Sequence, residues 1–176
     1  MIKKLKKNRF DHEFHIKLPL VQRSLNVNNG ILADIVMTRG DVQQRRTNVQ
    51  ADMTEWELHR LYEPVQALCT QALEVAEEIY PATFNDSKLY TRRCWGASYS
   101  KDDFTKEHNH ASNVYSWCYY ISMPEGASPI IFPEANLTIT PNEGDLILFS
   151  GLVRHSVPPS DYEGKRIMIA GNINVR

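Results

Sequence analysis

The sequence is poor in cysteine, in net charge and in long apolar runs. Its three cysteines, Cys69, Cys94 and Cys118, stand far apart and form no C-x-x-C pair. That spacing argues against a zinc ribbon or a disulfide framework and favours reduced, buried thiols in a cytoplasmic protein. Twenty Lys and Arg balance 21 Asp and Glu, so we expect no non-specific binding to nucleic acid. No apolar run is long enough to span a bilayer, so we expect no membrane contact. The basic residues 1–7 precede no apolar signal segment, so we expect them to form a solvated tail.

What the chain does contain is the composition of one ordinary domain. Hydrophobic residues make up 42% of its 176 residues and charged residues 23%, and a chain of this length can bury roughly two-thirds of its unfolded surface. No repeat, low-complexity tract or linker divides it. We therefore expect a single domain over residues 1–176, in which residues 1–87 supply supporting segments and helices and residues 88–176 form the core that carries the site.

The first half is predicted to begin with extended segments and to end in helices. The pattern over residues 16–37 indicates short extended segments interrupted at Asn28-Asn29-Gly30. The polar residues 39–52 indicate a loop, and its part 39–46 would close over the site as a lid. Thr54 and Glu57 fit a capping box, and Pro64 suits the first turn of a second helix that Pro81 ends. Apolar residues then recur at helical spacing, which predicts a helix packed on a sheet: Val65, Leu68, Ala72, Val75, Ala76 and Ile79.

From residue 88 onward the hydrophobic period changes to two, which is typical of strands. Turn-rich pieces containing Pro, Gly and Asn separate the apolar segments. Many short strands punctuated in this way favour a mainly β sandwich or jelly roll over a parallel sheet. The predicted strands are 89–95, 114–122, 130–132, 137–140, 146–149 and 166–175.

Three histidines of this half can meet at one point. His108 and His110 are two residues apart, so in a strand both imidazoles would face the same way. An apolar strand that follows Gly144 leads to His155, which would return a third imidazole to the first two. Imidazole suits Fe, Zn, Cu and Ni, and three protein ligands leave coordination positions open for a substrate. The alternatives are a surface or core pair of histidines and an unrelated loop histidine.

Arg166 follows eleven residues after His155 and opens an apolar strand. A guanidinium at the edge of a β-core needs a partner, and a carboxylate bound bidentately would supply one. A structural salt bridge to Asp145 or Glu163 is the alternative.

The order of these residues resembles that of the Fe(II)/2-oxoglutarate-dependent oxygenases. The resemblance extends from residue 95 to residue 175 and is strongest to the prolyl-hydroxylase-type branch and its small bacterial and phage members. No single motif is specific, but their order and spacing together are. The matching pieces are His108-Asn109-His110, Ser116-Trp117-Cys118-Tyr119-Tyr120-Ile121, Gly144-Asp145-Leu146-Ile147-Leu148-Phe149, His155-Ser156-Val157 and Lys165-Arg166-Ile167.

The resemblance implies a double-stranded β-helix, or jelly roll, with flanking helices. It implies an enzyme that hydroxylates an unidentified substrate with Fe(II), 2-oxoglutarate and O2, releasing succinate and CO2. His108 and His155 would be iron ligands, and Arg166 would bind the distal carboxylate of 2-oxoglutarate. Tyr120 matches a position where relatives place a phenol on that carboxylate, and Tyr99 matches a second tyrosine that faces the cosubstrate. For both tyrosines the alternative is an ordinary core aromatic.

The chain departs from the family at His110, which stands where an Asp or Glu is usual. Three interpretations follow: a three-histidine site, which we prefer; a carboxylate from elsewhere, such as Asp102, Asp103 or Glu134; or a site that has lost its metal. Glu107 would point to the opposite face of a regular strand. Three neutral imidazoles leave Fe(II) two positive charges rather than one, which would tighten binding of the 2-oxoglutarate dianion and alter redox tuning and metal preference.

Two other functions remain open from the sequence. One is a cupin-like three-histidine metalloprotein that does not use 2-oxoglutarate, in which Arg166 would lack a task. The other is a non-catalytic jelly-roll binding module. The sequence does not identify the substrate, which we expect to be a small molecule or a peptide. A mouth suited to a peptide, a metabolite or a nucleotide could be lined by Trp95, Trp117, Tyr119 and the pair Arg92-Arg93. All of these residues fit ordinary sheet faces equally well.

Overall fold

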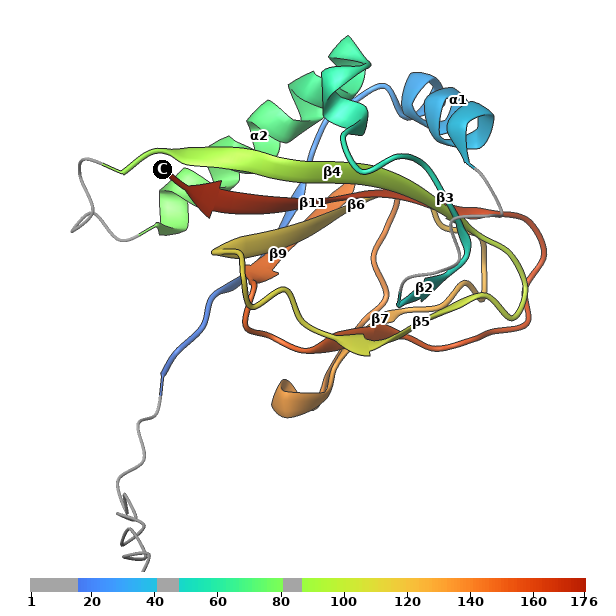
Figure 1. The fold of residues 1–176 in the computed structure, drawn as a ribbon. Helices are drawn as coiled ribbons and strands as arrows, with labels where there is room; N and C mark the ends of the chain where they lie inside the picture. The colour runs from blue at the N-terminus through green and yellow to red at the C-terminus, as the bar shows by residue number, and fades with distance from the viewer. Residues whose placement is uncertain (1–15, 41–47, 81–86) are drawn as a thin grey trace, which may run out of the picture.

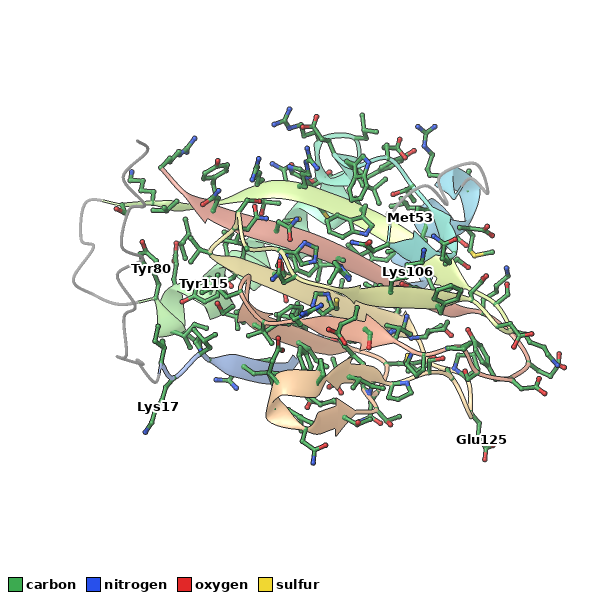
Figure 2. The ribbon with its side chains drawn as sticks, turned by 60° about the horizontal axis from the view of Figure 1, so that its bottom comes forward. Lys17, Met53, Tyr80, Lys106, Tyr115 and Glu125 are labelled. Carbon is green, nitrogen blue, oxygen red and sulfur yellow. The ribbon has the colours of Figure 1, made fainter. Side chains whose placement is uncertain are left out.

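A computed structural model describes residues 16–40, 48–80 and 87–176 of the chain. Two antiparallel sheets face each other, and the helices α1 and α2 lie on the outer side of the larger sheet (Figure 1). The larger sheet has the strand order β1-β9-β6-β11-β4-β3, and the smaller sheet the order β2-β5-β10-β7-β8. This arrangement confirms the predicted mainly β jelly roll, and Figure 2 shows Tyr80 and Tyr115 at one end of the sandwich and Glu125 at the other.

Each sheet draws its strands from distant parts of the chain. The larger sheet contains β1 (Leu20–Ser24), β3 (Asp52–Met53), β4 (Leu89–Tyr99), β6 (Tyr115–Ser122), β9 (Asp145–Ser150) and β11 (Arg166–Val175). The smaller sheet contains β2 (Val49–Gln50), β5 (Phe104–His108), β7 (Ile130–Phe132), β8 (Leu137–Ile139) and β10 (His155–Val157). The helices are α1 (Asn29–Arg39) and α2 (Glu63–Ile79), with short 3-10 turns η2 (Leu58–Arg60) and η4 (Pro133–Ala135).

The alternation of side chains along the strands divides the core in two. Outward-facing residues of the larger sheet, such as Leu148 and Ile169, pack against the helices. Inward-facing residues, such as Phe149 and Met168, pack between the sheets. Tyr119, expected at the mouth of the site, belongs to the outer core, where its hydroxyl donates to Asn29 Oδ1 at 2.7 Å. The space between the sheets is therefore the part of the fold available for a site.

Helix α2 agrees with its prediction, whereas the capping box does not. Pro64 occupies its first turn, and the predicted apolar positions are buried against the sheet except Ile79, which is partly buried. Thr54 is buried and caps no helix: its hydroxyl accepts from the Gly96 N–H at 2.9 Å and so ties the chain to β4. Pro81, the predicted end of the helix, lies outside the described residues.

Helix α1 corrects the extended segments predicted over residues 16–37. The prediction holds for β1, but a helix begins at Asn29, with the Asn28 side chain accepting from the Ile31 N–H. Leu32 and Val36, four residues apart, are fully buried. A glycine and several β-branched residues make this segment a weak helix former, so burial of one face on the sheet overrides local propensity.

The polar segment 39–52 also contains more structure than a loop. Strand β2 and the first residue of β3 lie within it, and β2 pairs with β5 at Val49–Thr105. The predicted lid lies outside the described residues except at 39–40, as does the basic start of the chain. Strands from residues 1–87 join both sheets, and the division at residue 87 stays a prediction. Within the described ranges no helix is long and apolar enough to cross a membrane.

Candidate metal centre

Three histidines converge between the sheets. The candidate ligand atoms of His108, His110 and His155 all lie within 4.8 Å of one another. Their ring centroids are 4.4 Å apart for His108–His155, 4.9 Å for His108–His110 and 5.2 Å for His110–His155. The structure thus brings together all three histidines that the sequence predicted.

The smaller sheet positions two of the three rings. His108 ends β5 and His155 begins β10, and they form a cross-strand pair. Backbone carbonyls orient both: His108 Nδ1 lies 2.8 Å from the Lys106 oxygen, and His155 Nδ1 lies 3.3 Å from the Val153 oxygen. Because a carbonyl only accepts, Nδ1 is the protonated nitrogen in each bonded ring, which leaves the Nε2 lone pair for a metal.

His110 arrives by a different route from the predicted one. Strand β5 ends at His108, so His110 lies in the turn that follows rather than in a strand. Its N–H donates to the Gly151 carbonyl at 2.8 Å, and the Gly151 N–H donates to Val114 at 2.9 Å. The Asn113 N–H closes the turn on the His110 carbonyl at 2.8 Å. The backbone beyond β9 therefore holds the third ring beside the other two.

Burial keeps these imidazoles neutral. Desolvation, followed by the neighbouring His108, lowers the pKa of His110 to about 4. Desolvation and then the other two rings lower the pKa of His155 to about 3. Burial also lowers the pKa of His108. Near neutral pH the nitrogens do not need to lose a proton before they bind a metal.

No carboxylate joins the histidines in the described part of the chain. Glu107 points away and pairs with Arg154 at 2.7 Å, as expected for the opposite face of the strand. Glu134 accepts from the Arg154 N–H at 3.2 Å, and Asp103 accepts from the Ser100 N–H at 2.8 Å. Asp102 is exposed in a left-handed turn with φ 64°. The geometry is therefore that of a three-histidine centre.

Arg166 lies in the same pocket and is almost completely buried, with 1% of its surface exposed. None of its three guanidinium nitrogens has a hydrogen-bond partner among the described residues. The alternative salt bridge to Asp145 or Glu163 is not formed among the described residues. Asp145 instead accepts from Gln22 and Ser24, and Glu163 is exposed. A buried cation without a partner is costly, so the guanidinium is suited to an anion that enters the pocket.

Two tyrosines flank this guanidinium. Its Cζ lies 4.6 Å from the ring centroid of Tyr99 and 5.2 Å from that of Tyr120. The Tyr120 hydroxyl is buried and has no hydrogen-bond partner among the described residues, whereas the Tyr99 hydroxyl lies 2.7 Å from Thr105 Oγ1. Burial raises the pKa of both phenols. Both therefore remain protonated, and Tyr120 has a free proton to donate.

The pocket measures about 460 Å³, including its open mouth. It contains the histidine rings, Arg166 and both tyrosines, and its other walls are largely apolar, as at Ile130 and Met168. All three cysteines are free and buried. Cys118 lines the pocket, and burial raises the pKa of its thiol to about 12, so it is no nucleophile.

Sequence reasoning missed several residues that build the pocket. Thr105 holds Tyr99, and Gly151 holds His110. Val49 is a wall residue outside every motif, and Phe149 is a wall residue that the sequence placed in a motif without a role in the site. The period of two along the strands contains a signal for some of them, because Arg166, Met168 and Ala170 alternate on one face of β11. Nothing local marks Gly151 or Val49, which come near through tertiary contacts.

Solved structures with this fold include two prolyl hydroxylases and a protein with nickel and 2-oxoglutarate bound. A prolyl-4-hydroxylase from Pseudomonas putida matches with a TM-score of 0.67 and 18% identity, over 89% of this chain and 92% of its own. The viral collagen prolyl hydroxylase of Paramecium bursaria Chlorella virus-1, in its 2OG complex, gives 0.66 and 15%, over 88% and 94%. HygX from Streptomyces hygroscopicus, with nickel and 2-oxoglutarate bound, gives 0.62 and 11%, over 88% and 82%.

No protein-family model matches the sequence, and comparison with curated proteins finds no match. The likeness to solved structures confirms, at the level of fold, the resemblance found in the sequence. The chain has the jelly-roll fold of these oxygenases, with a histidine cluster and a buried arginine in its central pocket.

Proposed function

We propose that this protein is an Fe(II)- and 2-oxoglutarate-dependent oxygenase that hydroxylates a C–H bond of its substrate. In the balanced reaction, 2-oxoglutarate, O2 and R–H give succinate, CO2 and R–OH, with one oxygen atom entering succinate and the other the product. The observation that carries the proposal is the buried, unpaired guanidinium of Arg166 in the pocket that holds three neutral histidines.

The residues present fit a divalent metal. His108, His110 and His155 offer three nitrogen donors from one side of the pocket, and imidazole suits Fe(II) and Ni(II). Bound Fe(II) would supply the activation of O2. The protein's own part is to hold the rings in place through the backbone bonds described above and to exclude bulk water with the apolar walls of the pocket.

Arg166 would bind the distal carboxylate of 2-oxoglutarate through its planar fork. Tyr120 would donate its unpaired hydroxyl proton to the same carboxylate, and Tyr99, held by Thr105, would support the guanidinium with its ring. Because the three protein ligands are neutral, a bound divalent ion keeps both its positive charges, which favours a dianionic cosubstrate. The cupin-like alternative leaves Arg166 buried without a partner, so we favour the oxygenase.

The test is substitution of Arg166 by alanine. We expect Arg166→Ala to weaken 2-oxoglutarate binding by at least about 100-fold, the loss expected for two charge-assisted hydrogen bonds, while metal affinity persists. Calorimetric titration of 2-oxoglutarate into the Ni(II) protein measures the affinity. The visible charge-transfer band that 2-oxoglutarate produces in the anaerobic Fe(II) protein gives a second readout.

Lys165→Ala is the matched control, since it removes the neighbouring positive charge, whose Nζ bonds Ser100 rather than facing the pocket. It should bind 2-oxoglutarate like the parent protein. Unchanged 2-oxoglutarate affinity in Arg166→Ala would remove the main support for the proposal, and a metal site that binds no 2-oxoglutarate in the parent protein would return the cupin-like reading.

A further inference from the structure

A second, wider cavity adjoins the first beside two of the histidines. It measures about 930 Å³, including its open mouth, and shares Val49, Trp95, His108 and His110 with the inner pocket. A molecule in this outer cavity would lie next to the metal ligands without displacing a cosubstrate held at Arg166.

Strand geometry explains how the outer cavity is connected to the inner pocket. Arg93, Trp95 and Tyr99 occupy alternate positions of β4, and Arg166 and Asn172 lie on the matching face of β11. Tyr99 pairs with Arg166 and Arg93 pairs with Asn172. Arg93 and Arg166 thus lie on the same face of two neighbouring strands. Along the strands they are separated by six residue positions, which is about 20 Å. The inner one serves the proposed cosubstrate site and the outer one lines the outer cavity.

An unbroken row of rings leads from the metal ligands to the outer arginine. The ring centroids of His110 and Trp95 are 6.2 Å apart, and those of Trp95 and Trp56 are 4.9 Å apart in an edge-to-face contact. The guanidinium of Arg93 lies 5.7 Å from the Trp56 ring centroid. This row gives a planar or apolar group a surface to pack on between Arg93 and the metal centre.

The polar groups of the outer cavity are suited to an anion. No Asp or Glu is among the described residues that line it. Arg93 is exposed and has no carboxylate within ion-pair distance in the described ranges, and its guanidinium contacts the Trp56 ring instead. Asn172 accepts from Ser116 Oγ at 2.7 Å through Oδ1, and its Nδ2 has no partner in the described part of the chain. Both groups therefore offer donors to a ligand.

We propose that the outer cavity binds the substrate, and that the substrate is a small acidic molecule with a ring or other flat apolar part. Its carboxylate or phosphate pairs with Arg93, and its flat part packs on Trp56 and Trp95 beside the metal centre. This inference deepens the proposed function and rests on it for the identification of the ligand as a substrate. The anion preference of the cavity itself is a property of this chain's own residues.

The experiment compares the binding of two acids with that of their neutral counterparts to the 176-residue chain. Indole-3-acetate is compared with indole-3-acetamide, and adenosine monophosphate with adenosine, by calorimetry. The protein is loaded with Ni(II) and saturating 2-oxoglutarate, so that Arg166 is occupied. We expect one acid to bind about tenfold more tightly than its neutral partner, as one charge-assisted hydrogen bond provides. The pair with the larger ratio identifies carboxylate or phosphate as the anion.

The variant Arg93→Gln should abolish this preference while leaving the affinities for the neutral probes, Ni(II) and 2-oxoglutarate unchanged. Arg60→Gln removes an exposed arginine outside the cavity and should retain the preference. Equal binding of acid and neutral probe, an unchanged preference in Arg93→Gln, or no binding by either acid would overturn the inference. If instead 2-oxoglutarate fails to bind, the proposed function fails. The same four titrations are then repeated without 2-oxoglutarate on Arg166→Ala, in which the acids cannot bind at Arg166, and they still decide whether Arg93 selects anions.

Discussion

His110 owes its place in the candidate metal centre to a backbone contact at Gly151 that leaves no room for a side chain. A Cβ added at Gly151 would lie 2.2 Å from the Asn113 oxygen and 2.7 Å from the His110 oxygen. Both contacts are with backbone atoms, which cannot rotate away. Only glycine therefore permits the backbones to approach so closely here. That approach in turn sets the orientation of His110.

Gly151→Ala should accordingly weaken metal binding although no ligand is changed. The added methyl group displaces the turn that carries His110, and we expect Ni(II) affinity to fall about 10- to 100-fold, as for other contacts that orient a ligand. Competition with a chromophoric chelator measures the affinity, and circular dichroism checks that the fold is retained.

The matched control is Gly30→Ala in α1, where an added Cβ finds nothing nearer than 3.4 Å. It should leave metal affinity unchanged and be neutral or slightly stabilising. If Gly151 acts through His110, Gly151→Ala should add little in a His110→Ala background. A full additional loss there would show that its effect reaches the metal by another route.

The histidine cluster was predictable from the sequence, but the way it is assembled was not. His108 and His155 are a cross-strand pair, as their positions around the apolar segment 146–149 allowed. His108 and His110 point to one spot as expected, but not by alternation in one strand, since β5 ends at His108. The two imidazoles converge through the contact between His110 and Gly151, and a contact across 41 positions leaves no local pattern.

At the scale of elements, Asp145 joins an edge strand to its neighbour. Its carboxylate accepts from Gln22 Nε2 at 2.8 Å and from Ser24 Oγ at 2.9 Å, both on β1. It also accepts from the Asn142 N–H at 2.8 Å, which closes the turn before β9. The Asp of the Gly144-Asp145 motif is thus explained by strand pairing, since it supplies no metal ligand and no partner for Arg166.

Asp145→Ala should lower the free energy of unfolding by about 2–3 kcal/mol, because it leaves part-buried donors on β1 and in the turn without their acceptor. Urea denaturation followed by tryptophan fluorescence measures the change. Metal affinity should be unaffected. Glu78→Ala, which removes an exposed ion pair to Arg23 of the same strand, should cost less than about 0.5 kcal/mol. Equal losses in the two variants would contradict the assigned role of Asp145.

The strands that could be predicted are those with enough length or a clear period. Strands β6, β7, β8, β9 and β11 lie within a residue of their predicted bounds, and β4 extends four residues beyond its prediction. All of them except β8 have an apolar face buried between or outside the sheets. The prediction missed β2, β3, β5 and β10, which have two to five residues each and depend on their pairing partners. Helix α1 was missed because its stability comes from the packing of Leu32 and Val36 on the sheet, where Val36 lies close against Gly96. Such tertiary packing leaves no local pattern.

At the scale of the whole molecule, the candidate site lies across the two sheets. His108 and His155 belong to the smaller sheet, and Arg166 belongs to the larger one. The inner core between the sheets contains the pocket, and the helices stabilise the larger sheet from the outer side (Figure 1). A ligand held at once by the metal and by Arg166 would therefore link the sheets, and its binding would oppose global unfolding.

If a ligand links the two sheets, the metal and 2-oxoglutarate should raise the melting temperature more together than the sum of their separate effects. A ligand that binds only the folded state at 100 times its Kd adds about 2.7 kcal/mol, which for a chain of this length raises Tm by about 5–10 °C. We expect Ni(II) to raise Tm by itself, 2-oxoglutarate alone to raise it little, and both together to raise it by more than the sum, because the metal supplies the second point of attachment. Differential scanning calorimetry of the full chain measures all four conditions, and succinate, which has the two carboxylates but lacks the keto group, is the control ligand. An equal shift from 2-oxoglutarate with and without Ni(II) would mean that Arg166 holds it without the histidines, and the two sheets would then not be linked through the cosubstrate.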